Sequence, residues 1–263
     1  MLVNCAVYRQ GLKVKDILIE EISDYLNKPD SFVWVALRDP TDAERDQAAE
    51  EFSLPPLAIE DVKKGNQRPK LEEYGNCIFV VMHTVELVDA NCGLSCGEVD
   101  IFAGPNFVLS VRKRTTQGFV NVRERTEREP ELLQHGSGFV LYAIMDTIVD
   151  RYFPIVDALE NQLETIEERI IETSKLARET VEEVYALKRK LMTVQHATAP
   201  LNEAVAKLYG GRVPQICLPM QEYFRDVGDH IVRVNKSLES VREMSTTAIQ
   251  VNLSLISLSD SEV

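Results

Sequence analysis

The chain of 263 residues contains no run of about 18 consecutive apolar residues, so none of its segments is apolar for long enough to span a bilayer. A glycine-rich phosphate loop, a nucleophile elbow and an HExxH helix are also missing. Ser137 in HGSGF does not have the strand-to-helix context of a hydrolase nucleophile. We therefore expect a protein that is not an enzyme.

Basic residues are too few to balance the acidic ones. Twenty-nine lysines and arginines stand against 42 aspartates and glutamates, which gives a net charge of −13. A surface of this charge repels phosphate backbones and anionic lipid and concentrates cations around the protein. Nucleic acid is therefore not an expected partner.

The five cysteines are an odd number, and no secretory signal precedes them, so we expect reduced thiols in a cytosolic setting. Cys92 and Cys96 could form half of a zinc site. However, no second Cys/His pair stands at ligand spacing, and His83 and His135 have no partner nearby in the sequence. We therefore interpret both cysteines as loop thiols.

The residues up to about 135 alternate between β-rich and helical runs. The expected strands are 5–9, 32–37, 77–87, 97–104 and 107–113. A first helix is expected over 16–27. A second is opened by a capping box of Thr41 and Glu44 and runs to about Phe52, and a third begins in the segment LPPLAIEDV. Strands interspersed with helices predict a mixed sheet flanked by helices, and the successive strands near its end make part of it antiparallel.

From about residue 118 the pattern predicts helices alone. Two apolar stripes with helical spacing follow each other: Ile148, Tyr152, Ile155, Leu159, Leu163, Ile166 and Ile170, and then Val181, Val184, Leu187, Leu191 and Val194. Gly210, Gly211 and Pro214 are expected to end the second helix, and a third begins near Leu218. A helix of about 40 residues is roughly 60 Å long, so it needs packing partners along its length.

The face opposite the first stripe is acidic. It carries Asp146, Asp150, Asp157, Glu160, Glu164, Glu167 and Glu172. For the outer part, from Glu160 to Glu172, a solvated face is favoured over ion binding because runs of charge are usually solvated. Asp146 differs because apolar residues surround it, so its carboxylate must be paired, protonated or bound to a metal.

Two further groups of acids could bind a cation. Asp226, Asp229 and His230 share one helix face, where carboxylates can supply the oxygen ligands that Mg²⁺ prefers. His230 is more often a hydrogen-bonded structural residue than a ligand. Glu60 and Asp61 close a predicted helix, where the negative end of the helix dipole disfavours them unless a cation lies nearby.

Several blocks, in this order, resemble the CorA family of divalent-cation transporters over essentially the whole chain. They are FVWVALRDP with the Thr41 and Glu44 cap, LPPLAIEDVKKGNQRPKLEEYGNCIFVVM, GFVLYAIMDTIVDRYFPIVDALE, YFRDVGDHIVRV and VNLSLISL. The resemblance implies an α+β fold, with an α/β/α sandwich in residues 1–135 and a stalk or funnel of long helices in residues 136–263. It also implies a homopentamer whose last helix continues into a membrane span that is absent here. The chain is then a soluble, cytoplasmic piece of a longer inner-membrane protein.

The resemblance further implies that Mg²⁺ bound between subunits holds the funnel closed. Asp61 would occupy the sensing position with Glu60 beside it, Asp226 would be its counterpart on a neighbouring subunit, and Asp146 would match another nearby acid. Gln250 and Ser261 depart from residues common in the family near the pore, which puts details of selectivity in doubt. A branch that carries Zn²⁺, Co²⁺ or Ni²⁺ is the alternative.

Two hypotheses from other classes stay open at this point. In one, the domain is a structural oligomerisation module whose acids only keep the helices solvated, so any salt replaces Mg²⁺. In the other, Asp146 and His230 serve an acid–base enzyme, which requires a pocket that the sequence does not reveal.

Overall fold

The computed structural model of the chain describes residues 1–28, 30–88, 93–172 and 177–261. Its centre is one seven-stranded sheet in the order β2-β1-β3-β7-β6-β5-β4. The strands are β1 Leu2–Arg9, β2 Leu12–Asp16, β3 Ser31–Arg38, β4 Lys70–Tyr74, β5 Cys77–Leu87, β6 Leu94–Gly104 and β7 Phe107–Lys113. The pair β3 and β7 is parallel and the other neighbours are antiparallel, as expected of a mixed sheet.

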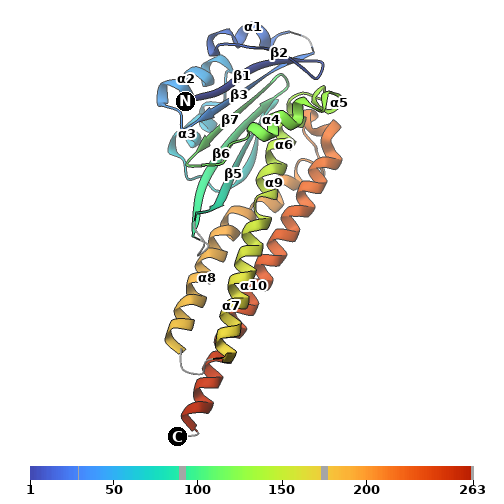
Figure 1. The fold of residues 1–263 in the computed structure, drawn as a ribbon. Helices are drawn as coiled ribbons and strands as arrows, with labels where there is room; N and C mark the ends of the chain where they lie inside the picture. The colour runs from blue at the N-terminus through green and yellow to red at the C-terminus, as the bar shows by residue number, and fades with distance from the viewer. Residues whose placement is uncertain (29, 89–92, 173–176, 262–263) are drawn as a thin grey trace.

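Helices cover both faces of the sheet and give three layers (Figure 1). On one face lie η1 Ile19–Glu21, α1 Ser23–Leu26, α2 Asp42–Glu51 and α3 Pro56–Lys64, and on the other lie α4 Val120–Glu127, α5 Pro130–Leu133 and α6 Ser137–Asp150. Alternate side chains of each strand point into separate apolar cores, so Val80 and Ile101 face α6 whereas Phe79 and Phe102 face α2 and α3.

The remaining helices form a long bundle that extends away from the sheet (Figure 1). They are α7 Phe153–Glu172, α8 Ala177–Thr198, α9 Leu201–Ala206, η2 Gln215–Met220 and α10 Gln221–Ser261. α10 has 41 residues and contacts α6, α7, α8 and α9 along its course. Its buried stripe of Phe224, Val227, Ile231, Val234, Leu238 and Val241 continues the core beneath the sheet. The fold is therefore the expected mixed-sheet α+β domain with long helices.

The predicted start signals of two helices are present in the structure. The Glu44 amide donates to Thr41 Oγ1 at 3.3 Å, and the Thr41 amide donates to Glu44 Oε2 at 2.9 Å, which completes the capping box of α2. α3 begins at Pro56, where the absent amide hydrogen of proline costs nothing.

The helix expected over 16–27 is present only as two short helical pieces, and its first residue ends a strand. Residues 12–16 form β2, and only the turns η1 and α1 follow. Gln10 and Gly11, with φ of 49° and 77°, make a two-residue hairpin between β1 and β2. A Cβ atom on Gly11 would lie 2.1 Å from the carbonyl oxygen of Pro130, so the position requires glycine. The hairpin fixes Leu12–Asp16 as an edge strand, and the helical residues begin only at Ile19.

The long helix expected through 148–170 is also divided, because α6 ends at Asp150 and α7 begins at Phe153. Pro154 has no amide hydrogen to donate to the carbonyl of Asp150, so the helical ladder is interrupted there. The helix of the second stripe ends at Thr198, ahead of Pro200, rather than at the glycines that follow α9. Both corrections place a proline at the break.

Candidate metal site

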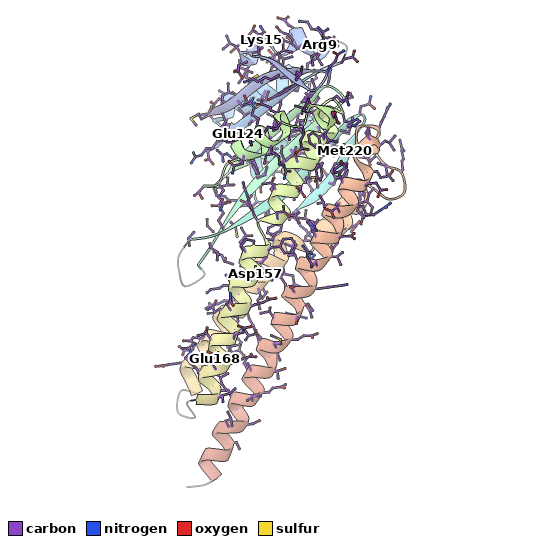
Figure 2. All side chains as sticks on the ribbon, turned by 45° about the vertical axis from the view of Figure 1, so that its right-hand side comes forward. Arg9, Lys15, Glu124, Asp157, Glu168 and Met220 are labelled. Atoms are coloured by element: carbon purple, nitrogen blue, oxygen red, sulfur yellow. The ribbon has the colours of Figure 1, made fainter. Side chains whose placement is uncertain are left out.

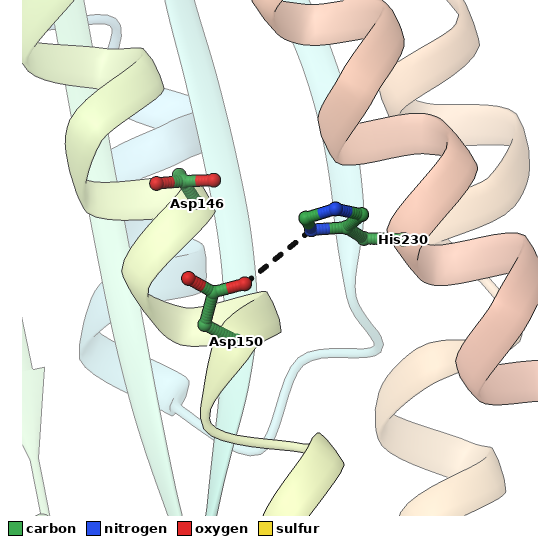
Figure 3. Close-up of side chains that lie close together, drawn as sticks. All are labelled: Asp146, Asp150 and His230. Atoms are coloured by element: carbon green, nitrogen blue, oxygen red, sulfur yellow. Dashed lines mark ion pairs between the residues drawn. The ribbon is translucent and has the colours of Figure 1, made fainter.

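Asp146, Asp150 and His230 form a compact cluster where α6 ends and α10 passes beside it (Figure 3). One ligand atom from each residue lies within 4.8 Å of the others. The two aspartates are four residues apart and share a face of α6, and the imidazole is that of His230, the tenth residue of α10. The site therefore joins the helix that packs on the sheet to the longest helix of the bundle.

The three side chains differ in exposure and in partners. Asp146 is 6% exposed, and its Oδ2 accepts from Arg125 Nη2 at 3.2 Å. His230 Nδ1 lies 3.3 Å from Asp150 Oδ1, yet this nitrogen has no hydrogen bond of good geometry within the described chain. A buried nitrogen without a well-formed hydrogen bond, beside two carboxylates, is a set of ligand atoms that could bind a divalent ion.

Burial and like charge both act on the inner carboxyl. Burial raises the pKa of Asp146, and the neighbouring charge of Asp150 raises it further, whereas Arg125 and His230 lower it. The expectation that this carboxylate needs compensation is thus consistent with its surroundings, and part of the compensation is Arg125. A dication placed between the two carboxylates would favour their ionised forms.

Asp226 lies on the outer side of the same imidazole. Its Oδ2 is 3.7 Å from His230 Nε2, and its side chain is 63% exposed. Asp150 and Asp226 therefore flank His230 from two helices. Asp229 is exposed and makes no ion pair or hydrogen bond with any described side chain, so the three residues 226, 229 and 230 do not act as one group in this structure.

Glu60 and Asp61 lie on α3, across the sheet from α6. Asp61 Oδ2 accepts from Lys70 Nζ at 2.6 Å, and Glu60 Oε1 pairs with Lys64 Nζ at 2.6 Å. Burial alone would lower the pKa of Lys70, but its bonds to Asp61 and Glu72 outweigh burial, and the pKa is raised. Within one chain, lysines thus supply the cations that the helix end requires, and Asp61 does not meet Asp146 or Asp226.

The other residues singled out in the sequence are not part of the cluster of Asp146, Asp150 and His230. Gln250 is exposed and lines a shallow groove between α8 and α10, and Ser261 is the last residue of α10. Cys92 lies outside the described residues, and Cys96 is an exposed free thiol. Between residues 1 and 261, with the gaps given above, no helix is long and apolar enough to cross a membrane.

Sequence reasoning does not identify Asp150 or Arg125 as parts of this site. The sequence pattern places Asp150 on the acidic helix face, although its spacing of four residues from Asp146 is a usable signal. Arg125 belongs to another helix and is 21 residues away from Asp146 in the sequence. Local spacing carries no information about such a pairing.

A family model and the sequences of known proteins both relate this chain to metal-ion transporters. The family model described as "CorA-like Mg2+ transporter protein" matches residues 29–261. The Bacillus subtilis (strain 168) protein "Putative metal ion transporter YfjQ" is 32% identical over 242 residues, which are 92% of this chain and 73% of that protein. The Thermotoga maritima "Cobalt/magnesium transport protein CorA" is 29% identical over 218 residues, which are 82% of this chain and 62% of that protein.

A comparison of folds also finds a CorA protein. The soluble domain of CorA from Methanocaldococcus jannaschii superposes with a TM-score of 0.72 at 20% identity, and the match covers 97% of this chain and 99% of that one. This agreement confirms the fold expected from the sequence. The chain therefore belongs to the CorA-like Mg²⁺ transporter family.

Proposed function

We propose that this chain is the regulatory part of a CorA-type channel and that it senses Mg²⁺ through carboxylates at its helix junctions. The observation that carries the proposal is the cluster of Asp146, Asp150 and His230 where α6 meets α10. Mg²⁺ retains several waters and needs few protein ligands, so a partly exposed cluster of this kind suits a weak sensor. A weak site is appropriate for an abundant ion.

Asp61 and Asp226 complete the proposal as a contact between subunits. Asp226 is 63% exposed and Asp61 25% exposed, so each retains surface through which a neighbouring subunit could be reached. In a homopentamer attached to a membrane through further residues, Mg²⁺ would have to displace Lys70 from Asp61. That competition would weaken the site further and make its occupancy depend on the Mg²⁺ concentration.

The proposal is tested by the effect of Mg²⁺ on thermal unfolding. A ligand that binds the folded chain alone adds about 1.4 kcal/mol at ten times its Kd, and about 1 kcal/mol raises the Tm of a protein this size by roughly 2–4 °C. We expect MgCl₂ to raise Tm, and NaCl at equal ionic strength not to do so. The structural-module hypothesis predicts equal effects of the two salts.

Matched variants test which residues produce the Mg²⁺-dependent rise in Tm. Asp150→Asn should remove most of the Mg²⁺-dependent rise in Tm, whereas Asp157→Asn, an exposed aspartate on the next helix (Figure 2), should leave it intact. If Asp150→Asn responds to Mg²⁺ like the wild type, the cluster is not the sensor.

His230 supports transport of Zn²⁺, Co²⁺ or Ni²⁺ as the second candidate function. Imidazole nitrogen is a better ligand for these ions than for Mg²⁺, which prefers oxygen. His230→Ala should therefore weaken Ni²⁺ or Zn²⁺ binding far more than Mg²⁺ binding if the transition metal is the ligand of this site. Titration calorimetry with each metal separates the two candidates.

A further inference from the structure

Arg125 is the arginine that lies against the proposed metal cluster. It belongs to α4, which contacts α6, and its Nη2 is 3.2 Å from Asp146 Oδ2. Among the residues that the structure describes, Asp146 is the only ion-pair and hydrogen-bond partner of this guanidinium. Asp146 is 6% exposed, whereas the Arg125 side chain is 45% exposed. The carboxylate is therefore held in place, and the guanidinium has room to turn into solvent.

This guanidinium compensates only part of the negative charge of the cluster. The ligand atoms of Asp146, Asp150 and His230 lie within 4.8 Å of one another. On the outer side, Asp226 Oδ2 is 3.7 Å from His230 Nε2. Arg125 pairs with one of these three carboxylates. Asp150 and Asp226 therefore still attract a cation while Arg125 is bonded to Asp146.

A divalent ion in the cluster and the Arg125 guanidinium would share the carboxylate of Asp146. Even on its two different oxygens, the two cations would be at most about 8 Å apart, which is no more than the Debye length at physiological salt. Salt therefore leaves most of their repulsion unscreened. A monovalent ion that replaced the guanidinium would exchange one positive charge for another, whereas Mg²⁺ brings a second charge that also attracts Asp150. Exchange is thus favourable for a divalent ion, and the released guanidinium regains water.

We propose that Arg125 is a built-in competitor of the metal: its guanidinium holds Asp146 when no metal is bound, and a divalent ion that binds the cluster releases it into solvent. The inference rests on the proposed function, because it concerns the regulation of the same cluster. The ion pair that has to be broken lowers the affinity of the cluster, so the cluster fills at a higher Mg²⁺ concentration. Release also removes the ion pair that attaches α4 to the cluster.

The test is titration calorimetry of the full chain with MgCl₂ at fixed ionic strength. Arg125→Gln should bind Mg²⁺ about tenfold more tightly than wild type, the gain expected when a competing charge-assisted hydrogen bond is removed. Arg125→Lys retains the charge and should stay within about threefold of wild type. A purely structural role of Arg125 predicts the opposite sign, because loss of a structural bond would disorder the cluster and weaken binding.

Release of the guanidinium can also be observed directly by NMR. In protein that carries isotope-labelled arginine, the Nε–H resonance of Arg125 is identified by its absence from Arg125→Gln. We expect MgCl₂ to move this resonance toward the position of solvent-exposed arginines, with the midpoint at the Kd from calorimetry. The resonance of Arg128, an exposed arginine on the same segment, should not move. An unmoved Arg125 resonance at saturating Mg²⁺ overturns the proposal.

Two controls separate this inference from the proposed function. Arg128→Gln removes the same charge from an exposed position and should leave the affinity within about twofold of wild type. Asp150→Asn, added to Arg125→Gln, should abolish the gain. If wild type binds Mg²⁺ at the cluster and Arg125→Gln binds it no more tightly, the competition is refuted and the proposed function stands. If only Arg125→Gln binds Mg²⁺, the competition is correct and the wild type is not the sensor. If neither binds, or if Asp150→Asn changes nothing, both are wrong.

Discussion

Replacing Asp100 with asparagine should remove the loss of stability that this protein suffers as pH rises toward 8. Asp100 and Glu98 on β6 are both fully buried beneath α3, with one ammonium, that of Lys113, between them. Lys113 Nζ lies 3.0 Å from Asp100 Oδ2 and 3.2 Å from Glu98 Oε1, and it also donates to the carbonyl of Val62. Neither oxygen of Asp100 has a hydrogen bond within the described chain.

The environment raises the pKa of Asp100 from 3.8 to about 7, because burial disfavours the charge, Glu98 adds repulsion, and Lys113 compensates only in part. A carboxyl with a higher pKa in the folded state binds its proton more tightly there. The free energy of unfolding therefore falls as pH rises from about 4 to about 7. At about 1.4 kcal/mol per pKa unit, the loss over this window is about 4 kcal/mol.

Asp100→Asn keeps the shape and cannot ionise, so its unfolding free energy should not fall in this window. Urea unfolding followed by circular dichroism at pH 5, 6, 7 and 8 measures the difference from wild type. That difference should become more favourable to the variant by about 3 kcal/mol between pH 5 and pH 8. Any cost of the buried amide itself is the same at each pH.

Asp16→Asn is the control, because this aspartate is exposed and, among the described residues, forms an ion pair only with Lys13. Its curve should follow that of wild type at every pH. If the curves of Asp100→Asn and wild type are also parallel from pH 5 to pH 8, the charge of Asp100 is not lost on folding and the reasoning is refuted.

Three further substitutions have effects that the structure specifies. Thr41→Ala removes the cap of α2 and should cost about 1 kcal/mol, measured by urea unfolding. Gly138→Ala places a Cβ atom 1.9 Å from the carbonyl oxygen of Ile216 and should lower Tm by several degrees, about 2–4 °C per kcal/mol, so an unchanged Tm would contradict the packing. Lys70→Gln frees Asp61 from its 2.6 Å partner, so MgCl₂ should raise Tm more than in wild type, and an equal rise would exclude Asp61 as a ligand.

The sequence predicts the parts of the fold where local preference and tertiary packing agree. The strands β1, β3, β5, β6 and β7 are rich in β-branched and aromatic residues that the two cores bury, so they were predicted. The sequence does not predict β2 and β4, because LKVKD and KLEEY are only five residues long, are rich in charged residues and lie at the two edges of the sheet. Edge strands bury little apolar surface, so their pairing depends on the adjoining turns rather than on their amino-acid composition.

The candidate site also has a part that the sequence predicts and a part that it does not. A charged residue within an apolar run, such as Asp146, and a spacing of four residues, such as Asp226 with His230, can be recognised from a single helix. The pairing of Asp61 with Lys70 joins a helix to a strand, and that of Arg125 with Asp146 joins two helices. These contacts depend on how the layers stack, which the local pattern does not specify.

The break between α6 and α7 bears on how the proposed metal site would act on the rest of the chain. α6 packs on the sheet and α7 belongs to the bundle, so the two residues between them separate two bodies of the chain. Tyr152, in that break, is fully buried and donates to the carbonyl of His83 on β5, which fixes the sheet side of the junction. His230 is on α10, which continues for 31 further residues to the end of the bundle. A cation that binds Asp150 and His230 only in one arrangement of these elements stabilises that arrangement by its difference in affinity, and α10 carries the effect to its far end.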